Sequence, residues 1–223
     1  MNKGFLNISE LFYSIQGEST WAGLPCAFIR LSDCNLRCSY CDSAYTWKEP
    51  GRAAAYQDIL SWLEHYPGVM VELTGGEPLL QENIYPFINL LLDERRTVLV
   101  ETNGSLSIDQ IPPQVSVILD IKCPDSGMHN RNDWNNINLL AARKDKNSRD
   151  EVKFVLCSEN DFLWAKNIIE QYNLTGIAPV LLSPVEYLMA PSHLAELIMQ
   201  HHLSAKLQLQ LHRLLWPEKA RGV

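Results

Sequence analysis

Three of the six cysteines of this chain lie within one short segment, as Cys34, Cys38 and Cys41. A C-x3-C-x2-C spacing can bring three thiolates to one metal centre. Iron–sulfur clusters usually take four cysteine ligands, so a triad leaves one iron with an open coordination position. A substrate or a cofactor can bind at that position.

A tetrahedral zinc site is the alternative for the same triad, with Cys26, Cys123 or one of the six histidines as fourth ligand. Zinc ribbons usually carry two separated C-x2-4-C groups, and this sequence has only one. The spacing therefore favours an iron–sulfur cluster. Cys26, Cys123 and Cys157 stand alone in the sequence, and isolated cysteines are most often small buried hydrophobic residues.

The length and charge of the chain limit the classes of protein to which it can belong. A chain of 223 residues that is 46% hydrophobic can bury one sizeable core, so we expect one domain over residues 1–223. A formal net charge of -7 disfavours nucleic acid as a partner and favours a small-molecule substrate. Residues Met1 to Ser9 lack the pattern of a signal peptide, and no segment approaches the roughly 20 apolar residues of a membrane span. We expect a cytoplasmic protein.

The elements that must position the cysteines follow an alternating pattern. Apolar runs rich in β-branched residues predict strands at Ala27 to Leu31, Val69 to Leu73, Val98 to Glu101, Val115 to Ile121, Val152 to Leu156, Ile177 to Leu182 and Lys206 to Leu211. Helical spacing predicts helices at Ala53 to Tyr66, Glu82 to Arg96, Asp133 to Lys144, Asn160 to Tyr172 and Ser192 to His202.

Strands that alternate with helices favour an α/β fold with a parallel sheet and helices on its outer face. Eight β/α units typically need about 250 residues, so we expect a partial, open parallel β/α barrel of about six strands.

Polar residues follow several of the predicted strands, at Thr74, Thr102, Asp120, Ser183 and His212. Ligands of parallel β/α proteins bind where the carboxyl ends of the strands meet. Each of these residues could alternatively be an ordinary loop or helix-cap residue. Their shared position at strand ends indicates a binding site along one edge of the sheet.

Two motifs together resemble the radical S-adenosylmethionine (SAM) superfamily. Tyr40 precedes the last cysteine of the triad, and Thr74-Gly75-Gly76-Glu77-Pro78 follows a predicted strand. The resemblance implies a 4Fe-4S cluster on Cys34, Cys38 and Cys41, with the amino and carboxylate groups of SAM on the open iron. Reductive cleavage of SAM would yield a 5′-deoxyadenosyl radical, so the cofactor and no side chain would carry the catalytic chemistry.

The resemblance also implies which residues contact SAM. The Gly-Gly-Glu motif would hold the methionine amino group, although Gly-Gly-Glu-Pro alone could be a tight turn. The implied contacts are Tyr40, Asp42, Gly75, Gly76, Glu77, Thr102, Asn103, Asp120, Lys122 and Ser183. Many members have Ser-Pro-Lys where this chain has Asp120-Ile121-Lys122, so Lys122 matches the pattern and Asp120 departs from it.

The N-terminal segment, with Phe12 to Glu18, Gly23 to Pro25 and Phe28 to Arg30, resembles the 7-carboxy-7-deazaguanine synthase family. Members are lyases that convert 6-carboxy-5,6,7,8-tetrahydropterin to 7-carboxy-7-deazaguanine with loss of ammonia. The product leads to queuosine and other 7-deazapurines. The resemblance therefore implies a radical SAM lyase.

Carried onto this sequence, the family pattern implies a substrate site. Backbone groups of Ile15, Gln16 and Gly17 would contact the pterin, and Glu18 would accept its ring N–H groups. Arg30 would bind the substrate carboxylate as a bidentate fork. Thr74 and His212, and as a further candidate Gln210, would complete the site, and the hydroxyl of Ser43 would bind Mg²⁺.

Other interpretations of these residues remain open from the sequence alone. Glu18 could be a solvated surface acid, and Arg30 could form a structural ion pair with an acid of the chain. Two other functions share the cysteine triad: an activating enzyme that makes a glycyl radical on a partner protein, and a zinc-stabilised binding module. The family expectation is a homodimer that receives electrons from an external one-electron reductant of flavodoxin or ferredoxin type.

Overall fold

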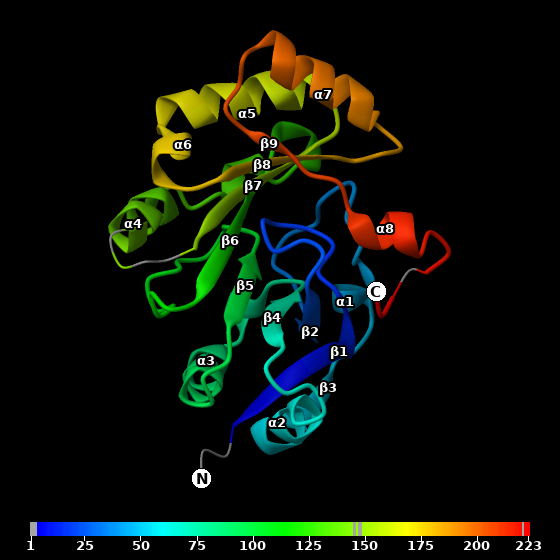
Figure 1. Cartoon of the computed structure of the whole chain (residues 1–223), viewed down its shortest axis with the longest axis vertical. Helices are drawn as coiled ribbons and strands as arrows, with labels where there is room; N and C mark the ends of the chain where they lie inside the picture. Colours follow the sequence, from blue (N-terminus) through cyan, green and yellow to red (C-terminus); the bar gives the residue numbers. More distant parts are fainter. Residues whose placement is uncertain (1–3, 145, 147–148, 220) are drawn as a thin grey trace.

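One open sheet organises the computed structural model, which describes residues 4–144, 146, 149–219 and 221–223 (Figure 1). Its nine strands have the order β3-β1-β2-β4-β5-β6-β7-β8-β9. The strands are β1 Phe5–Ile15, β2 Pro25–Leu31, β3 Arg52–Ala55, β4 Met70–Gly75, β5 Val98–Thr102, β6 Ser116–Ile121, β7 Glu151–Leu156, β8 Val180–Pro184 and β9 Lys206–Leu207. From β2 to β9 all neighbours are parallel, whereas β1 is antiparallel to both β2 and β3.

The helices lie mainly on one side of this curved sheet. They are α1 Tyr45–Lys48, α2 Tyr56–Leu63, α3 Ile84–Asp93, α4 Asn135–Lys144, α5 Glu159–Gln171, α6 Leu174–Ile177, α7 Pro191–Gln200 and α8 Leu211–Leu215. Figure 1 shows α2 to α7 in a row along the outer side, with α1 and α8 on the other side. No helix in the described part of the chain is both long and apolar enough to cross a membrane.

The alternation of side chains along each parallel strand gives the sheet two different faces. Residues such as Ile29, Leu73 and Phe154 belong to the main core, together with helix residues such as Phe87 and Phe162. The other face carries a smaller apolar cluster of Phe12, Cys26, Phe28, Met70, Leu99 and Ile118. On the same face, nearer the carboxyl ends of the strands, the alternating positions are polar: Arg30, Glu72, Thr74, Glu101, Asp120, Lys153 and Ser183.

The prediction of an open, parallel α/β architecture is confirmed, since the two edge strands β3 and β9 do not pair with each other in the described chain. Seven strands are parallel where about six were expected. The sequence analysis missed β1 and β3. The predicted helix from Ala53 begins only at Tyr56, because Ala53 to Ala55 pair with β1.

The last predicted strand is also shorter than expected. Only Lys206 and Leu207 pair with β8, and the predicted end of that strand, Leu211, begins α8. The amide of Leu211 instead donates to the carbonyl of Gly17, 2.9 Å away. The chain therefore leaves the sheet edge and turns toward the inner face.

A buried ion pair joins α4 to the amino end of β6. Arg143 donates to the carboxylate of Asp150 at 2.8 Å, and to the carbonyls of Ile111 at 2.6 Å and Val115 at 2.7 Å. Asp150 in turn accepts the amide of Val117 at 2.9 Å. Both side chains are almost completely buried, so each charge depends on its partner.

Replacing Arg143 by methionine is expected to lower the free energy of unfolding by about 3 to 5 kcal/mol, because the carboxylate of Asp150 stays buried without its partner. Urea unfolding of the metal-free protein measures the change. Lys166→Met is the control, since it removes a partly exposed helix pair with Glu170, worth about 0.3 to 0.5 kcal/mol. Equal stability losses in the two variants would contradict this prediction.

Candidate active site

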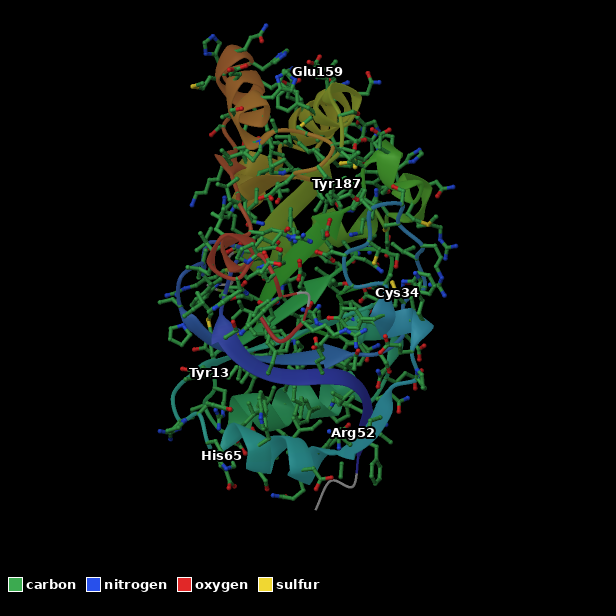
Figure 2. All side chains as sticks on the ribbon, turned by 90° about the vertical axis from the view of Figure 1, so that its right-hand side faces the viewer. Tyr13, Cys34, Arg52, His65, Glu159 and Tyr187 are labelled. Carbon is green, nitrogen blue, oxygen red and sulfur yellow. The ribbon has the colours of Figure 1, made fainter. Side chains whose placement is uncertain are left out.

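A polar chamber with a volume of about 760 Å³ opens on the inner face, where the carboxyl ends of the parallel strands meet. Figure 2 looks onto this side of the molecule, and two residues that line the chamber, Cys34 and Tyr187, are labelled there. Every predicted site residue except Glu77 contributes to the lining. Residues from the first hairpin to the C-terminal segment therefore meet around one space.

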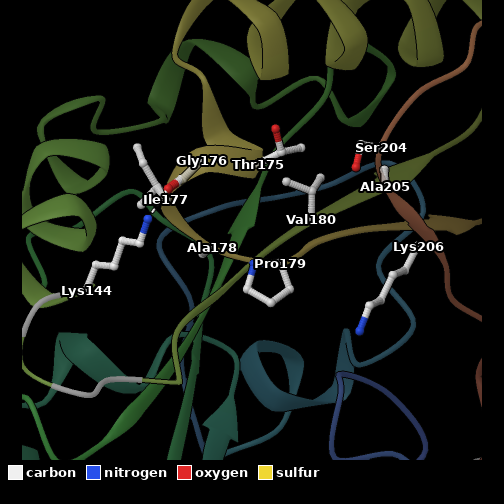
Figure 3. Close-up of a pocket in the computed structure, with 10 residues that line it drawn as sticks. All are labelled: Lys144, Thr175, Gly176, Ile177, Ala178, Pro179, Val180, Ser204, Ala205 and Lys206. Carbon is white, nitrogen blue, oxygen red and sulfur yellow. Dashed lines mark hydrogen bonds between the residues drawn. The ribbon is translucent and has the colours of Figure 1, made fainter.

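A second hollow lies at the opposite, amino end of β8, between α6 and the segment before β9 (Figure 3). Its volume is about 450 Å³, and it has no cysteine, histidine or acidic residue in its lining. One of its two lysines, Lys144, donates to the carbonyl of Gly176 at 2.5 Å. The chemistry-bearing residues of the sequence lie in the chamber and not here.

The cysteine triad lies in the long connection between β2 and α1. The Sγ of Cys34 is 3.4 Å from the amide of Leu36 and 3.7 Å from Nδ2 of Asn103. N–H groups that point at a thiolate sulfur are typical of iron–sulfur sites, where they tune the cluster. Burial raises the pKa of the Cys34 thiol, and the nearby ammonium of Lys122 opposes this shift.

The cysteines of the triad are not gathered around a single point in this structure. In the described residues, no three side chains among His, Cys, Asp and Glu are grouped closely enough to hold one ion. Cys34, Cys38 and Cys41 nevertheless all line the chamber. Three thiols around one space, with N–H donors at the Sγ of Cys34, are a donor set that suits an iron–sulfur cluster.

Two glycines at the end of β4 allow the cysteine-bearing loop to approach the sheet. A Cβ on Gly75, whose φ is 141°, would lie 2.3 Å from the carbonyl oxygen of Leu31. A Cβ on Gly76 would lie 2.0 Å from the carbonyl oxygen of Asp33. Any side chain at these positions would therefore push away the segment that leads into Cys34.

The structure places Glu77 behind the chamber wall, although the sequence analysis expects it to contact SAM. Its carboxylate accepts the hydroxyl of Thr102 at 2.8 Å and the amides of Asn103 at 2.7 Å and Leu79 at 3.0 Å. Burial raises the pKa of Glu77 to about 7. In this structure, Glu77 fixes the end of β5, which carries Asn103 to the side chain of Cys34.

Charged residues that the sequence analysis missed form the floor of the chamber. The ammonium of Lys153 lies 2.7 Å from Glu101 and also pairs with Glu18. Burial opposes ionisation of Glu101, but the charge of Lys153 outweighs this effect and lowers the pKa of Glu101. Burial, together with the charges of Glu101 and Glu18, raises the pKa of Glu72, which bonds to the side chain of Gln16.

A signal for these residues was present in the sequence. Glu72 lies between Val71 and Leu73, and Lys153 lies between Val152 and Phe154, inside predicted strands. A charged residue in the middle of an apolar strand is rarely buried unless it is paired, so its face of the sheet must be polar.

Arg30 lines the chamber, and it also has a partner within the protein. Its Nε lies 3.3 Å from the carboxylate of Glu10, and Tyr45 donates to the same carboxylate at 2.9 Å. The structural ion pair that was one interpretation of the sequence is thus formed. The geometry is poor, however, because Nε makes no hydrogen bond with the described residues.

Asp120 lines the chamber, and its two carboxylate oxygens differ in their hydrogen bonding. Its Oδ2 accepts the ammonium of Lys122 at 2.8 Å, whereas its Oδ1 has no hydrogen-bond partner among the described residues. Buried acceptors are usually satisfied, so this oxygen is suited to a hydroxyl or amino group of a bound molecule. The polar lining next to the cysteines therefore fits SAM.

The N-terminal candidates meet the C-terminal ones across the chamber. Gly17 packs against His212, since a Cβ on Gly17 would lie 2.3 Å from Nδ1 of His212. Glu18 accepts the side-chain amide of Gln210 at 2.7 Å. Burial lowers the pKa of His212, so its imidazole favours the neutral form.

The chain is similar to proteins of one family. Residues 29–155 match the Radical SAM superfamily. The 7-carboxy-7-deazaguanine synthase of Chlorobaculum tepidum is 43% identical over 98% of this chain and 97% of its own length. The synthase of Koribacter versatilis is 36% identical over 98% of this chain and 100% of its own. The fold is similar to that of QueE from Escherichia coli, with a TM-score of 0.74, 21% identity, and coverage of 92% and 94% of the two chains.

Replacing Lys153 by methionine is expected to make the protein less stable at neutral than at mildly acidic pH. In the native protein Lys153 lowers the pKa of Glu101, so Glu101 contributes stability above about pH 4.5 that is lost as the pH falls. Without the ammonium, the buried carboxylates resist ionisation, and stability falls as the pH rises through their raised pKa values.

Urea unfolding of the variant and the native protein at about pH 5 and about pH 8 measures the effect, which we expect to be about 2 kcal/mol larger at the higher pH. Lys166→Met is again the matched control. A destabilisation by Lys153→Met that does not change with pH would show that Lys153 does not set the ionisation of its neighbours.

Proposed function

The chain belongs to the 7-carboxy-7-deazaguanine synthase family of the radical SAM superfamily, and from this premise we propose how its chamber holds the cofactors and the substrate. The proposed reaction is conversion of 6-carboxy-5,6,7,8-tetrahydropterin to 7-carboxy-7-deazaguanine with loss of ammonia. The observation that carries the proposal is that the cysteine triad and the carboxylate-rich floor line one chamber.

Cys34, Cys38 and Cys41 would hold the 4Fe-4S cluster, and SAM would bind beside it. When bound, these two groups supply an organic radical that removes a hydrogen atom from the substrate. The chain contributes donors and acceptors around them: Asn103 reaches the Sγ of Cys34, and Asp120 offers its unpaired Oδ1. Gly75 and Gly76 keep the strand end close to the cysteine loop.

The substrate would bind between the first hairpin and the floor. Glu18 presents a carboxylate to the N–H groups of the pterin ring, and Lys153 keeps that region of the floor charge-balanced. Arg30 would exchange its poorly aligned contact with Glu10 for the substrate carboxylate, which matches the guanidinium fork. Holding the substrate at two ends fixes the reacting C–H bond, and rate enhancement in such a step comes largely from this positioning.

We place the proposed Mg²⁺ at Ser43. Its hydroxyl lines the chamber and lies 4.0 Å from the Sγ of Cys41. Magnesium keeps several water ligands in most protein sites, so one hydroxyl together with substrate oxygens is a sufficient set.

The remaining features of the proposal concern the whole protein. We propose one radical SAM domain over residues 1–223, a homodimer, and an external one-electron donor of flavodoxin or ferredoxin type. One sheet and one dominant core support the single domain. Thiols that ligate iron must stay reduced, which supports a cytoplasmic location. The family membership disfavours both the activating enzyme and the zinc-stabilised module.

Anaerobic turnover with dithionite, SAM, Mg²⁺ and the carboxytetrahydropterin tests the function, with the deazaguanine acid detected by mass spectrometry. The reconstituted protein is expected to be brown and to form the product. Cys38→Ala is expected to lose the visible absorbance, most of its iron and all product formation. Cys157→Ala is the control, because this cysteine lies outside the chamber lining and should keep the cluster. A brown Cys38→Ala variant with native iron content would refute the assignment of the triad.

Arg30→Ala is expected to keep its cluster and its cleavage of SAM, while kcat/KM for the pterin falls about 100-fold through loss of a charge-assisted pair. Arg30→Lys keeps the charge without the planar fork, so its activity should lie between those of the native protein and Arg30→Ala. Steady-state kinetics under dithionite, with SAM cleavage assayed separately, measure both effects. Product formation by Arg30→Ala at the native rate would exclude substrate binding by Arg30.

A further inference from the structure

The loop between β1 and β2, residues 16–24, crosses the inner face and bonds to strands far from its own hairpin. Its Thr20 donates through both amide and hydroxyl to the buried carboxylate of Glu151, at the start of β7. Its Gly17 accepts the amide of Leu211 at 2.9 Å. The open side of the barrel is therefore bridged by this loop and by the segment that follows β9.

Gln208 joins these two segments through two hydrogen bonds of its side chain. Its side chain is only 6% exposed. The side-chain oxygen accepts the amide of Ser19 at 2.6 Å, and the side-chain nitrogen donates to Oε2 of Glu18 at 3.0 Å. A backbone amide can only donate, so the contact with Ser19 fixes the orientation of the Gln208 amide and directs its NH₂ group to Glu18.

The backbone of Gln208 is fixed as well, since its amide donates to the carbonyl of Leu182 in β8 at 2.9 Å. Gln208 therefore connects the sheet to the loop rather than joining two loose segments. Ser19 has a φ of 64°, which is uncommon for a residue other than glycine. Such a conformation persists where surrounding bonds hold it, and Gln208 provides one of those bonds.

Glu18 has two further donors, but neither of them also binds the loop backbone next to Glu18. Lys153 and Gln210 both contact the Glu18 carboxylate, Gln210 at its Oε1. Gln208 and Lys153 share Oε2, but only Gln208 also holds the neighbouring backbone of Ser19. Removal of Gln208 thus takes one bond from the carboxylate and one from the loop that carries it.

We propose that Gln208 is a positioning residue for the reaction: it fixes the Glu18 carboxylate and the adjacent loop in the geometry that binds the pterin ring. This inference rests on the proposed function, because Glu18 is the proposed contact to the ring. Gln208 itself lies outside the chamber lining, so it acts through Glu18.

Two substitutions separate positioning of Glu18 from support of the loop. Gln208→Met has a similar size and loses both hydrogen bonds. Gln208→Glu keeps an oxygen for the amide of Ser19, but it cannot donate to Glu18 and adds a second negative charge beside it. Gln200→Met, at an exposed position at the end of α7, is the matched control.

For Gln208→Met we expect the KM and the equilibrium Kd for the pterin to rise roughly 10- to 100-fold, because a hydrogen bond to a charged group is lost. The Kd for SAM and the rate of SAM cleavage without substrate should stay at native values. Gln208→Glu should be impaired at least as strongly, because it cannot donate to Glu18 and places a second negative charge beside it. Gln200→Met should behave as the native protein.

Native pterin binding by Gln208→Met would overturn the proposal. Native binding by Gln208→Glu would also overturn it, because the loop would then need only an acceptor for Ser19. Equilibrium dialysis of the pterin gives the Kd without turnover. If the native protein binds the pterin and forms no deazaguanine, the proposed function fails, and the Kd values still decide the role of Gln208.

Discussion

The ammonium of Lys153 stabilises the interior of this barrel, because it offsets the negative charge of carboxylates that lie on the same face of the sheet. Glu101 and Glu18 both pair with it, and Glu72 lies close enough for their charges to raise its pKa. An apolar cluster with residues such as Phe28 and Met70 fills the lower part of the same face. The charged floor therefore lies between this cluster and the chamber, where electrostatic interactions are stronger than in water.

The same face joins two kinds of chemistry that have different requirements. A cluster needs sulfur ligands on a loop that closely approaches the sheet, and Gly75 and Gly76 permit this approach. In the proposed function, a polar ring with a carboxylate would need fixed oxygens and a guanidinium, which the first hairpin and β2 would supply through Glu18 and Arg30. Alternation along each strand meets both needs, because the outward residues can remain apolar and form the main core.

The sequence was most informative where local spacing carries the information. The cysteine triad, the Gly-Gly-Glu motif and the β/α alternation predicted the open parallel architecture, and every predicted site residue except Glu77 lines the chamber. It was least informative about pairing partners. Strand β3 is mostly alanine, and it forms a strand because it pairs with β1. The role of Lys153 likewise depends on its ion pairs with acids on other elements. Propensity and spacing do not encode such contacts between distant segments.

Glu77 illustrates the same limit within a motif. Its position after two glycines predicts a ligand contact, and in the structure its carboxylate binds the end of the neighbouring strand. The spacing fixed the place of Glu77 near the site, but not the direction of its side chain.

The hydrogen bond between Ser19 and Gln208 joins residues 189 positions apart in the chain. Contacts of such long range form late in folding, because the entropy of closing the intervening segment must be overcome first. On the ribosome, the β1–β2 hairpin emerges well before Gln208, so its loop cannot make this bond until the segment after β9 has been synthesised. The chamber therefore stays open between the first hairpin and that segment while the chain is still growing.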